Sequence, residues 1–108
     1  MIWAWKYSVD GLRAISKERA FRQELMLGAL LFGIECFRET SVNARLFLLG
    51  AFILVLVTEC LNSAIETIVD RIGIEQHPLS KKAKDLGSAA VLITLVHFTI
   101  VWIISWFW

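Results

Sequence analysis

The 108-residue sequence contains few residues that break or cross-link a chain: one proline, six glycines and two cysteines. Cys36 and Cys60 lie within apolar segments and form no CxxC or Cys/His pattern, so we expect packing residues rather than a disulfide or a metal site. Eleven basic and ten acidic residues leave a net charge of +1, with no strongly basic segment. We therefore expect no nucleic-acid partner.

Familiar catalytic motifs are also missing. No GxxxxGK[ST], GxGxxG, HRD or DFG pattern occurs, which excludes a soluble-kinase fold more firmly than it excludes phosphoryl transfer itself. There is no GxSxG or HExxH motif either. The first 24 residues carry charges throughout, unlike a signal peptide, and we expect them to be retained.

Apolar residues, in contrast, make up 57% of the chain, and the mean hydropathy is +0.65. These values exceed what a small soluble core uses and indicate a membrane protein with a single domain, residues 1–108. The pattern predicts an all-α fold, with an amphipathic surface helix over residues 1–23 and transmembrane helices over about 24–38, 46–72 and 84–107. The second transmembrane helix exceeds the bilayer thickness of about 30 Å, so its last turns should emerge into the interface.

The basic residues predict the orientation in the membrane. Nine precede the first span or follow the second: Lys6, Arg13, Lys17, Arg19, Arg22, Arg71, Lys81, Lys82 and Lys84. Only Arg38 and Arg45 lie between these spans. By the positive-inside rule, the N-terminus and the loop around His77 face the cytoplasm.

A polar stripe follows the apolar run of the second span. Its members are three, four or seven residues apart and share one helical face: Glu59, Asn62, Ser63, Glu66 and Asp70. Carboxylates at membrane depth need a partner, and Lys84 is one candidate. Another is Glu18, which could pair with Glu66 around a magnesium ion. Hydrogen bonding between neighbouring helices is the simpler alternative.

Two further polar residues stand alone near or within the spans. Glu35 lies close to the outer end of the first span, where we expect it to snorkel toward the interface. For His97 we expect an interhelical hydrogen bond. We assign neither residue a catalytic role.

Several blocks carry a family resemblance: ECLNSAIE at 59–66, VDR at 69–71, EQH at 75–77, AKDLGSAA at 83–90, and near the N-terminus GLR at 11–13 and AFRQE at 20–24. Together they closely resemble the small integral-membrane diacylglycerol kinases of Gram-negative bacteria. The related undecaprenol kinases of Gram-positive bacteria usually depart from the Gly-Ser-Ala-Ala found at 87–90. We therefore favour diacylglycerol as the acceptor.

The resemblance implies a homotrimer in the bacterial inner membrane, with three transmembrane helices and one surface helix per subunit. It further implies cytoplasmic-side active sites, shared between subunits, that use ATP and Mg²⁺. Glu59 matches the general base and Asn62 a polar residue beside it, while Glu18 and Glu66 match the metal ligands. Positions that match nucleotide contacts are Tyr7, Glu75, Gln76, His77, Lys84, which reaches the phosphates, and Asp85. Positions that match lipid contacts are Arg13, Ala20, Phe21, Arg22, Gln23, Glu24, Ser88 and Trp102.

The expected activity is direct transfer of the γ-phosphoryl group of MgATP to diacylglycerol, which gives phosphatidic acid. Undecaprenol is the alternative acceptor. A non-enzymatic rival is a small transporter or assembly subunit with an ion-coupled site at Glu59 and Glu66. It ranks lower because the polar groups gather on one side of the membrane and leave residues 46–58 apolar.

Overall fold

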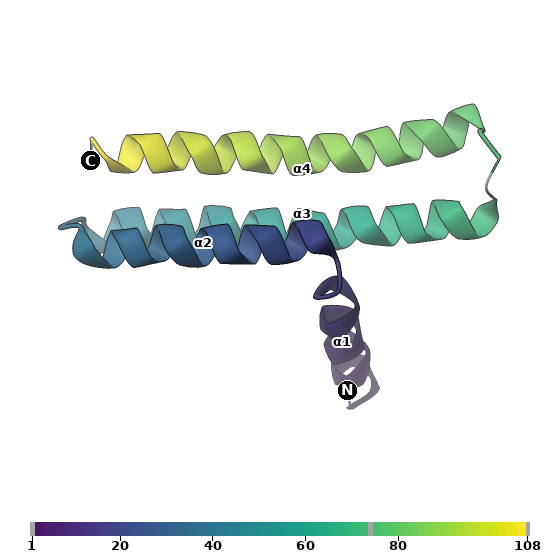
Figure 1. Ribbon diagram of the computed structural model, residues 1–108, viewed down its shortest axis with the longest axis horizontal. Coiled ribbons are helices and arrows are strands. Elements are labelled where there is room, and N and C mark those ends of the chain that lie inside the picture. The colour runs from purple at the N-terminus through teal and green to yellow at the C-terminus, as the bar shows by residue number, and fades with distance from the viewer. Residues whose placement is uncertain (1, 74, 108) are drawn as a thin grey trace.

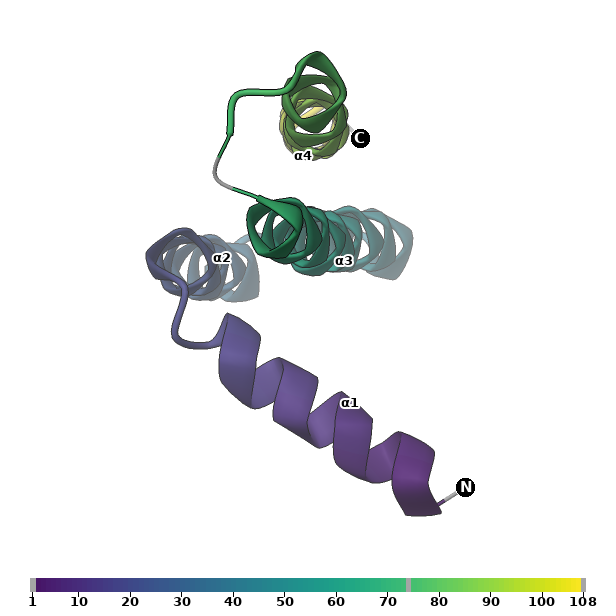
Figure 2. The same ribbon diagram turned by 90° about the vertical axis from the view of Figure 1, so that its right-hand side faces the viewer.

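A computed structural model describes residues 2–73 and 75–107, which form four α-helices. They are α1 (Ile2–Ile15), α2 (Arg19–Phe37), α3 (Val42–Ile72) and α4 (Pro78–Ser105). Helices α2 and α4 run in the same direction, both antiparallel to α3, while α1 leaves the bundle at a steep angle (Figure 1). Seen along the bundle, α2 and α4 both lie against α3 (Figure 2). The predicted all-α architecture is confirmed.

The helix boundaries differ in places from those expected. Helix α1 ends at Ile15, so residues 19–23, expected in the surface helix, begin α2 instead. The break falls at Ser16, whose hydroxyl donates to the Arg13 carbonyl at 2.7 Å, and the Glu18 N–H donates to the Ile15 carbonyl at 2.9 Å. No glycine or proline marks this turn in the sequence. Local hydrogen bonding by serine ends α1 there instead.

Capping residues explain the other boundaries. Helix α3 begins at Val42, four residues before the expected start, because the Ser41 hydroxyl accepts from the Ala44 N–H at 3.1 Å. Helix α4 begins at Pro78, which occupies its first turn, and His77 Nδ1 accepts from the Leu79 N–H at 3.1 Å. The extended backbone of His77 is the conformation expected before a proline.

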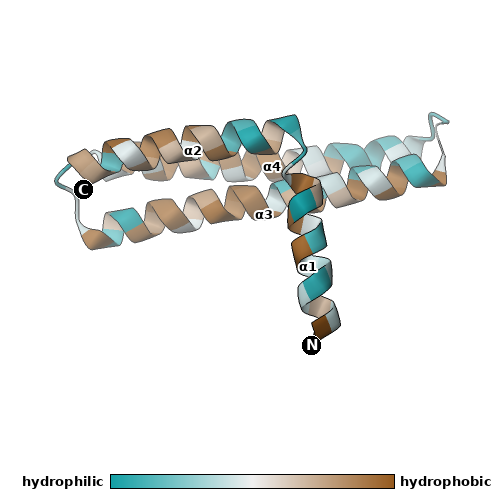
Figure 3. Cartoon of the chain, turned by 60° about the horizontal axis from the view of Figure 1, so that its bottom comes forward, coloured by the Kyte–Doolittle hydropathy of each residue, from teal (hydrophilic) through white to brown (hydrophobic). Residues whose placement is uncertain are grey.

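Two of the described helices, α3 and α4, are long and apolar enough to cross a membrane. At 1.5 Å per residue, the 31 residues of α3 reach about 46 Å. Hydrophilic colouring gathers at the turn between α3 and α4, whereas hydrophobic residues dominate the opposite half of the bundle (Figure 3). The polar end of α3 thus projects beyond the part suited to hydrocarbon.

Helices α3 and α4 pack along one continuous seam. The α3 side consists of buried residues spaced three or four apart: Ala44, Leu48, Ala51, Val55 and Glu59. On α4 the buried positions Gly87 and Thr94 are seven residues apart, and the Thr94 and Thr58 hydroxyls lie 3.0 Å from one another. Small and polar side chains therefore bring these helices together, as is usual in membrane bundles.

Candidate active site

The turn between α3 and α4 lines an open pocket of about 610 Å³. Its lining residues come from the last turns of α3, the first turns of α4 and the turn between them. These segments form the polar end of the bundle (Figure 3). Its polar lining comes from Asp70, Glu75, Gln76, His77, Ser80, Lys81, Lys84 and Asp85. The pocket is large enough for a drug-sized ligand and is open to solvent on one side.

Two lysines supply positive charge to this pocket. Lys84 Nζ donates to Asp70 Oδ1 at 2.7 Å and so joins α4 to α3, while Lys81 Nζ donates to Asp85 Oδ2 at 2.6 Å. Both pairs are solvent-exposed. Because an ammonium has three N–H donors, each lysine keeps donors for a phosphate group. The contact between Lys84 and Asp70 also confirms that Lys84 faces the polar stripe.

Deeper along α3, two carboxyl groups meet. Glu59 is buried on α3, and the side chain of Glu24 from α2 reaches its carboxyl group. The second Glu24 oxygen, Oε2, is buried without a hydrogen-bond partner. Two carboxylates in contact repel one another when both are charged, so a hydrogen-bond donor placed between them is favourable.

Asn62 lies one turn after Glu59, against α4. Its Nδ2 donates to Glu66 Oε1 at 3.3 Å, and its Oδ1 is buried without a partner. A methyl group at Gly87 would collide with this Oδ1 atom, so only glycine lets the amide lie so close to α4. Two buried oxygens at or beside the stripe, Glu24 Oε2 on α2 and Asn62 Oδ1 on α3, therefore remain available to a hydrogen-bond donor.

Comparison with known proteins identifies the family. The family model for prokaryotic diacylglycerol kinase matches residues 6–106. The chain belongs to the prokaryotic diacylglycerol kinase family. It is 48% identical over 105 residues to the diacylglycerol kinase of Escherichia coli K12, covering 96% of this chain and 86% of that protein. Identity to the diacylglycerol kinase of Haemophilus influenzae is 44% over 103 residues (94% and 87% covered), and to that of Pseudomonas aeruginosa 43% over 97 residues (89% and 79%).

In this member of the diacylglycerol kinase family, the residues predicted to contact nucleotide divide into two groups. Five of them line the pocket at the α3–α4 turn: Glu75, Gln76, His77, Lys84 and Asp85. Tyr7 instead lies exposed on α1, away from that pocket. The structure thus brings the predicted loop and lysine positions together within one chain but does not add Tyr7 to them.

The two predicted magnesium ligands occupy different surroundings. Glu18 borders a separate hollow of about 520 Å³ between α1 and α3, with Cys60, Ser63 and Thr67. Glu66 is exposed beside Asn62, on the side of α3 that faces Lys84. In the described ranges, no three His, Cys, Asp or Glu side chains cluster in a way that could hold a metal ion. A carboxylate near a pocket that could take a phosphate group still suits magnesium, which completes its coordination with phosphate oxygens and water.

The predicted lipid-contact residues follow α2 and α4. Phe21 is buried, whereas Ala20, Arg22, Gln23 and Ser88 are exposed. Arg13 is exposed on α1 and lies 3.9 Å from Asp10. Trp102, near the far end of α4, stacks on Phe98 with 6.5 Å between ring centroids. These positions are spread along the bundle rather than gathered at one point.

Sequence reasoning missed two features of the site. Lys84 was expected to face the stripe, but Asp70 was not singled out as the residue that binds it. Glu24 was expected only to contact lipid, yet it meets Glu59. The spacing of Phe21, Gly28 and Glu35, each seven residues apart and all buried, marks the α2 face that packs on α3. Glu24 lies near that face, which is the signal that could have placed it beside α3.

Proposed function

We propose that this protein transfers the γ-phosphoryl group of ATP to the primary hydroxyl of diacylglycerol. Membership of the prokaryotic diacylglycerol kinase family, matched over residues 6–106, carries the proposal. The position of the polar residues supports it. A buried carboxyl group lies within the bundle on α3, and a solvent-open pocket with two lysines lies at the end of the same helix. A lipid acceptor can therefore approach α3 from the membrane, and a water-soluble donor can approach the same helix from the solvent.

In the proposed reaction, Glu59 accepts the proton of the acceptor hydroxyl as its oxygen attacks the γ-phosphorus. The bond from that phosphorus to the β–γ bridging oxygen breaks, and ADP leaves. Glu24 and Asn62 border this position, because Glu24 meets Glu59 from α2 and Asn62 lies one turn further along α3. Lys84 stabilises charge on the phosphates, which is the main catalytic task in phosphoryl transfer.

We further propose that Glu66, with Glu18, holds Mg²⁺ on the nucleotide. Magnesium in this position would neutralise phosphate charge. Because the two carboxylates lie in different surroundings within one chain, we infer that neighbouring subunits of a homotrimer complete the ligand set. Large exposed apolar side chains on the helices, among them Leu30, Leu92 and Ile93, support burial against lipid or other copies.

The proposed setting is the bacterial inner membrane, with the N-terminus in the cytoplasm. Here α2 forms the third membrane span together with α3 and α4. Its 19 residues reach about 28 Å, close to the bilayer core of about 30 Å, provided that Arg19 and Arg22 extend to the headgroups.

Glu59→Gln tests the function directly. The amide has nearly the same shape but cannot accept a proton, so we expect magnesium-dependent phosphatidic acid formation to fall by about 100- to 10,000-fold. Radiolabelled ATP and mixed-micelle diacylglycerol provide the assay, with native mass spectrometry to show that the oligomer is unchanged. Near-normal turnover would refute the assignment of Glu59 as the base.

Acceptor identity requires a parallel assay. Faster phosphorylation of undecaprenol than of diacylglycerol would make the chain an undecaprenol kinase. Proton-coupled flux in liposomes without any phosphorylated lipid would instead favour the transporter alternative. Wild-type protein is sufficient for both measurements.

A further inference from the structure

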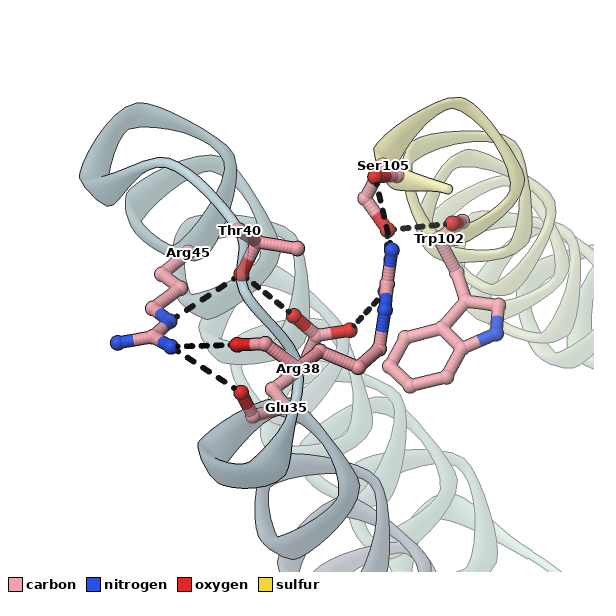
Figure 4. A network of polar contacts seen from close by, with 6 residues as sticks. All are labelled: Glu35, Arg38, Thr40, Arg45, Trp102 and Ser105. Carbon is pink, nitrogen blue, oxygen red and sulfur yellow. Dashed lines mark hydrogen bonds and ion pairs between the residues drawn. The ribbon is translucent and has the colours of Figure 1, made fainter. Parts of the chain in front are cut away.

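A second polar cluster lies at the end of the bundle opposite the candidate active site. It joins the C-terminal end of α2, the following loop, the start of α3 and the C-terminal end of α4 (Figure 4). We call it the outer clasp, and it consists of Glu35, Arg38, Thr40, Arg45 and Ser105. Glu35 is only 2% exposed, so the expectation that it snorkels to the interface is wrong.

Hydrogen bonds satisfy both oxygens of the buried Glu35 carboxylate. Arg38 Nη1 donates to Oε1, and the Thr40 hydroxyl donates to Oε2 at 3.2 Å. Arg45 binds the carbonyls at the C-terminal end of α2: its Nη2 donates to those of Glu35 and Arg38 at 3.2 and 3.0 Å (Figure 4). Helix ends leave such carbonyls without partners, and a cation is favourable beside them.

Arg38 also connects α2 to α4. Its Nη2 donates to the Ser105 carbonyl at 3.1 Å, and its guanidinium carbon lies 3.6 Å from the centroid of the Trp106 ring. Ser105 is 1% exposed, and its hydroxyl donates to the Trp102 carbonyl at 2.6 Å. The planar guanidinium thus contacts a carboxylate, a carbonyl and an indole at once, an arrangement that a lysine ammonium does not reproduce.

Helix α2 depends on few other attachments. Helices α3 and α4 contact one another along most of their length, whereas α2 contacts α3 much less. Midway along α2, Gly28 lies directly against the Phe52 ring. Glu24 and Glu35 are eleven residues apart, which is just over three full turns and about 16 Å. Both side chains therefore point toward the same side of α2, so a shift at one end displaces the other.

We propose that the outer clasp sets the axial and rotational position of α2, and thereby places Glu24 against Glu59 at the active site. Glu35 and Arg38 are positioning residues in this arrangement, because they act through α2. The inference rests on the proposed kinase activity. The pocket at the α3–α4 turn contains no residue of α2, so we expect the clasp to change kcat more than KM for MgATP, although Glu18 at the start of α2 would move with the helix.

The double variant Glu35→Leu/Arg38→Leu separates positioning from stability. Removing one partner leaves an unpaired buried charge, whereas replacing both by apolar residues is often neutral or stabilising. We expect the double variant to remain folded, with kcat reduced about 10- to 100-fold and KM for MgATP within about twofold of wild type. Glu39→Gln is the control, since Glu39 is a nearby exposed carboxylate with no hydrogen bond or ion pair in the described residues.

Distances between spin labels provide a readout that does not depend on activity. Labels at Cys36 and at Ile103→Cys, in a Cys60→Ala background, report the separation of the outer ends of α2 and α4. We expect a broader distance distribution in the double variant than in Glu39→Gln. If the double variant does not fold, Arg38→Lys replaces it, because lysine keeps the pair with Glu35 but not the bridge to Ser105.

Wild-type kcat in a folded clasp variant, or an unchanged distance distribution, would overturn the proposal. Such a result would leave the kinase assignment intact, because that assignment is tested by Glu59→Gln. Conversely, if Glu59 is not the base, Glu59→Gln will show near-normal turnover although its clasp is unaltered.

Discussion

Lys84 illustrates how a single contact prepares the candidate site for a phosphate. Its long side chain is flexible, and both lysine and arginine side chains carry about 2 kcal/mol of rotamer entropy. The 2.7 Å hydrogen bond to Asp70 restricts that freedom before any nucleotide binds. Asp70 is therefore more than a solvated end of the stripe, because it holds the lysine at the edge of the pocket.

Asp70→Asn should weaken nucleotide binding more than turnover. We expect KM for ATP to rise about two- to fivefold with kcat nearly unchanged, because an exposed ion pair contributes up to about 1 kcal/mol. Steady-state kinetics at saturating diacylglycerol measure both constants. Asp10→Asn is the control, since Asp10 is also exposed and lies 3.9 Å from an arginine. A fall in kcat without a change in KM would contradict this role for Asp70.

Gly87 tests the close approach of Asn62 to α4. In Gly87→Ala the new methyl group would displace the Asn62 amide, and with it the hydrogen bond to Glu66. We expect kcat to fall by roughly tenfold or more, as misplaced catalytic groups generally cause. Gly50→Ala, where nothing lies within 4 Å of the new carbon, is the matched control. Equal activity of the two variants would show that the position of Asn62 does not matter.

At the scale of whole helices, two glycines of α2 offer a test of how this helix packs. A methyl group at Gly28 would strike the Phe52 ring, whereas Gly33 faces open space. Alanine favours a helix over glycine by about 1 kcal/mol in either position. Overpacking typically costs about 1–3 kcal/mol, so the two substitutions should act in opposite directions.

We therefore expect Gly28→Ala to lower the thermal stability in detergent and Gly33→Ala to leave it unchanged or raise it. Circular dichroism during heating measures the difference. Equal melting temperatures for both variants would mean that α2 does not rest on Phe52. Gly28→Ala should also reduce turnover, because it moves α2 and hence Glu24.

The helices themselves were largely predictable, because long apolar runs and the face shared by Glu59, Asn62 and Glu66 are local patterns. The contact of Lys84 with the stripe was also foreseen. The approach of Glu24 to Glu59 was not, because it depends on how α2 packs against a helix 35 residues further along the chain. The interhelical hydrogen bond expected for His97 is not found within this chain: its side chain is exposed and has no partner in the described ranges.

The outer clasp shows why isolated charges are the least predictable part of such a sequence. Glu35 was expected to reach solvent because no partner was apparent. Its nearest partner is Arg38, only one turn away, but the bridge from Arg38 to Ser105 spans 67 residues. Helical spacing indicates the first contact, while only the packed bundle places the second.

For the whole molecule, the polar turn and the outer clasp mark opposite ends, and the proposed orientation places them on opposite sides of the membrane. Single cysteines at Glu39 and Gln76, in a Cys36→Ser/Cys60→Ala background, test this topology. We expect a membrane-impermeant maleimide to label Glu39→Cys in spheroplasts, and Gln76→Cys only after lysis. The reverse labelling pattern would invert the orientation.

The length of α3 has a consequence for how reaction rates depend on the lipid. Moving an acyl chain from the bilayer into water costs about 0.8 kcal/mol per CH₂ group, so extraction of diacylglycerol would be prohibitive. A helix that begins in hydrocarbon and continues beyond it lets the lipid remain dissolved in the membrane while the nucleotide arrives from water. Velocity should then follow the mole fraction of diacylglycerol in the membrane plane, and adding inert lipid should slow the enzyme even when the amount of diacylglycerol per volume is constant.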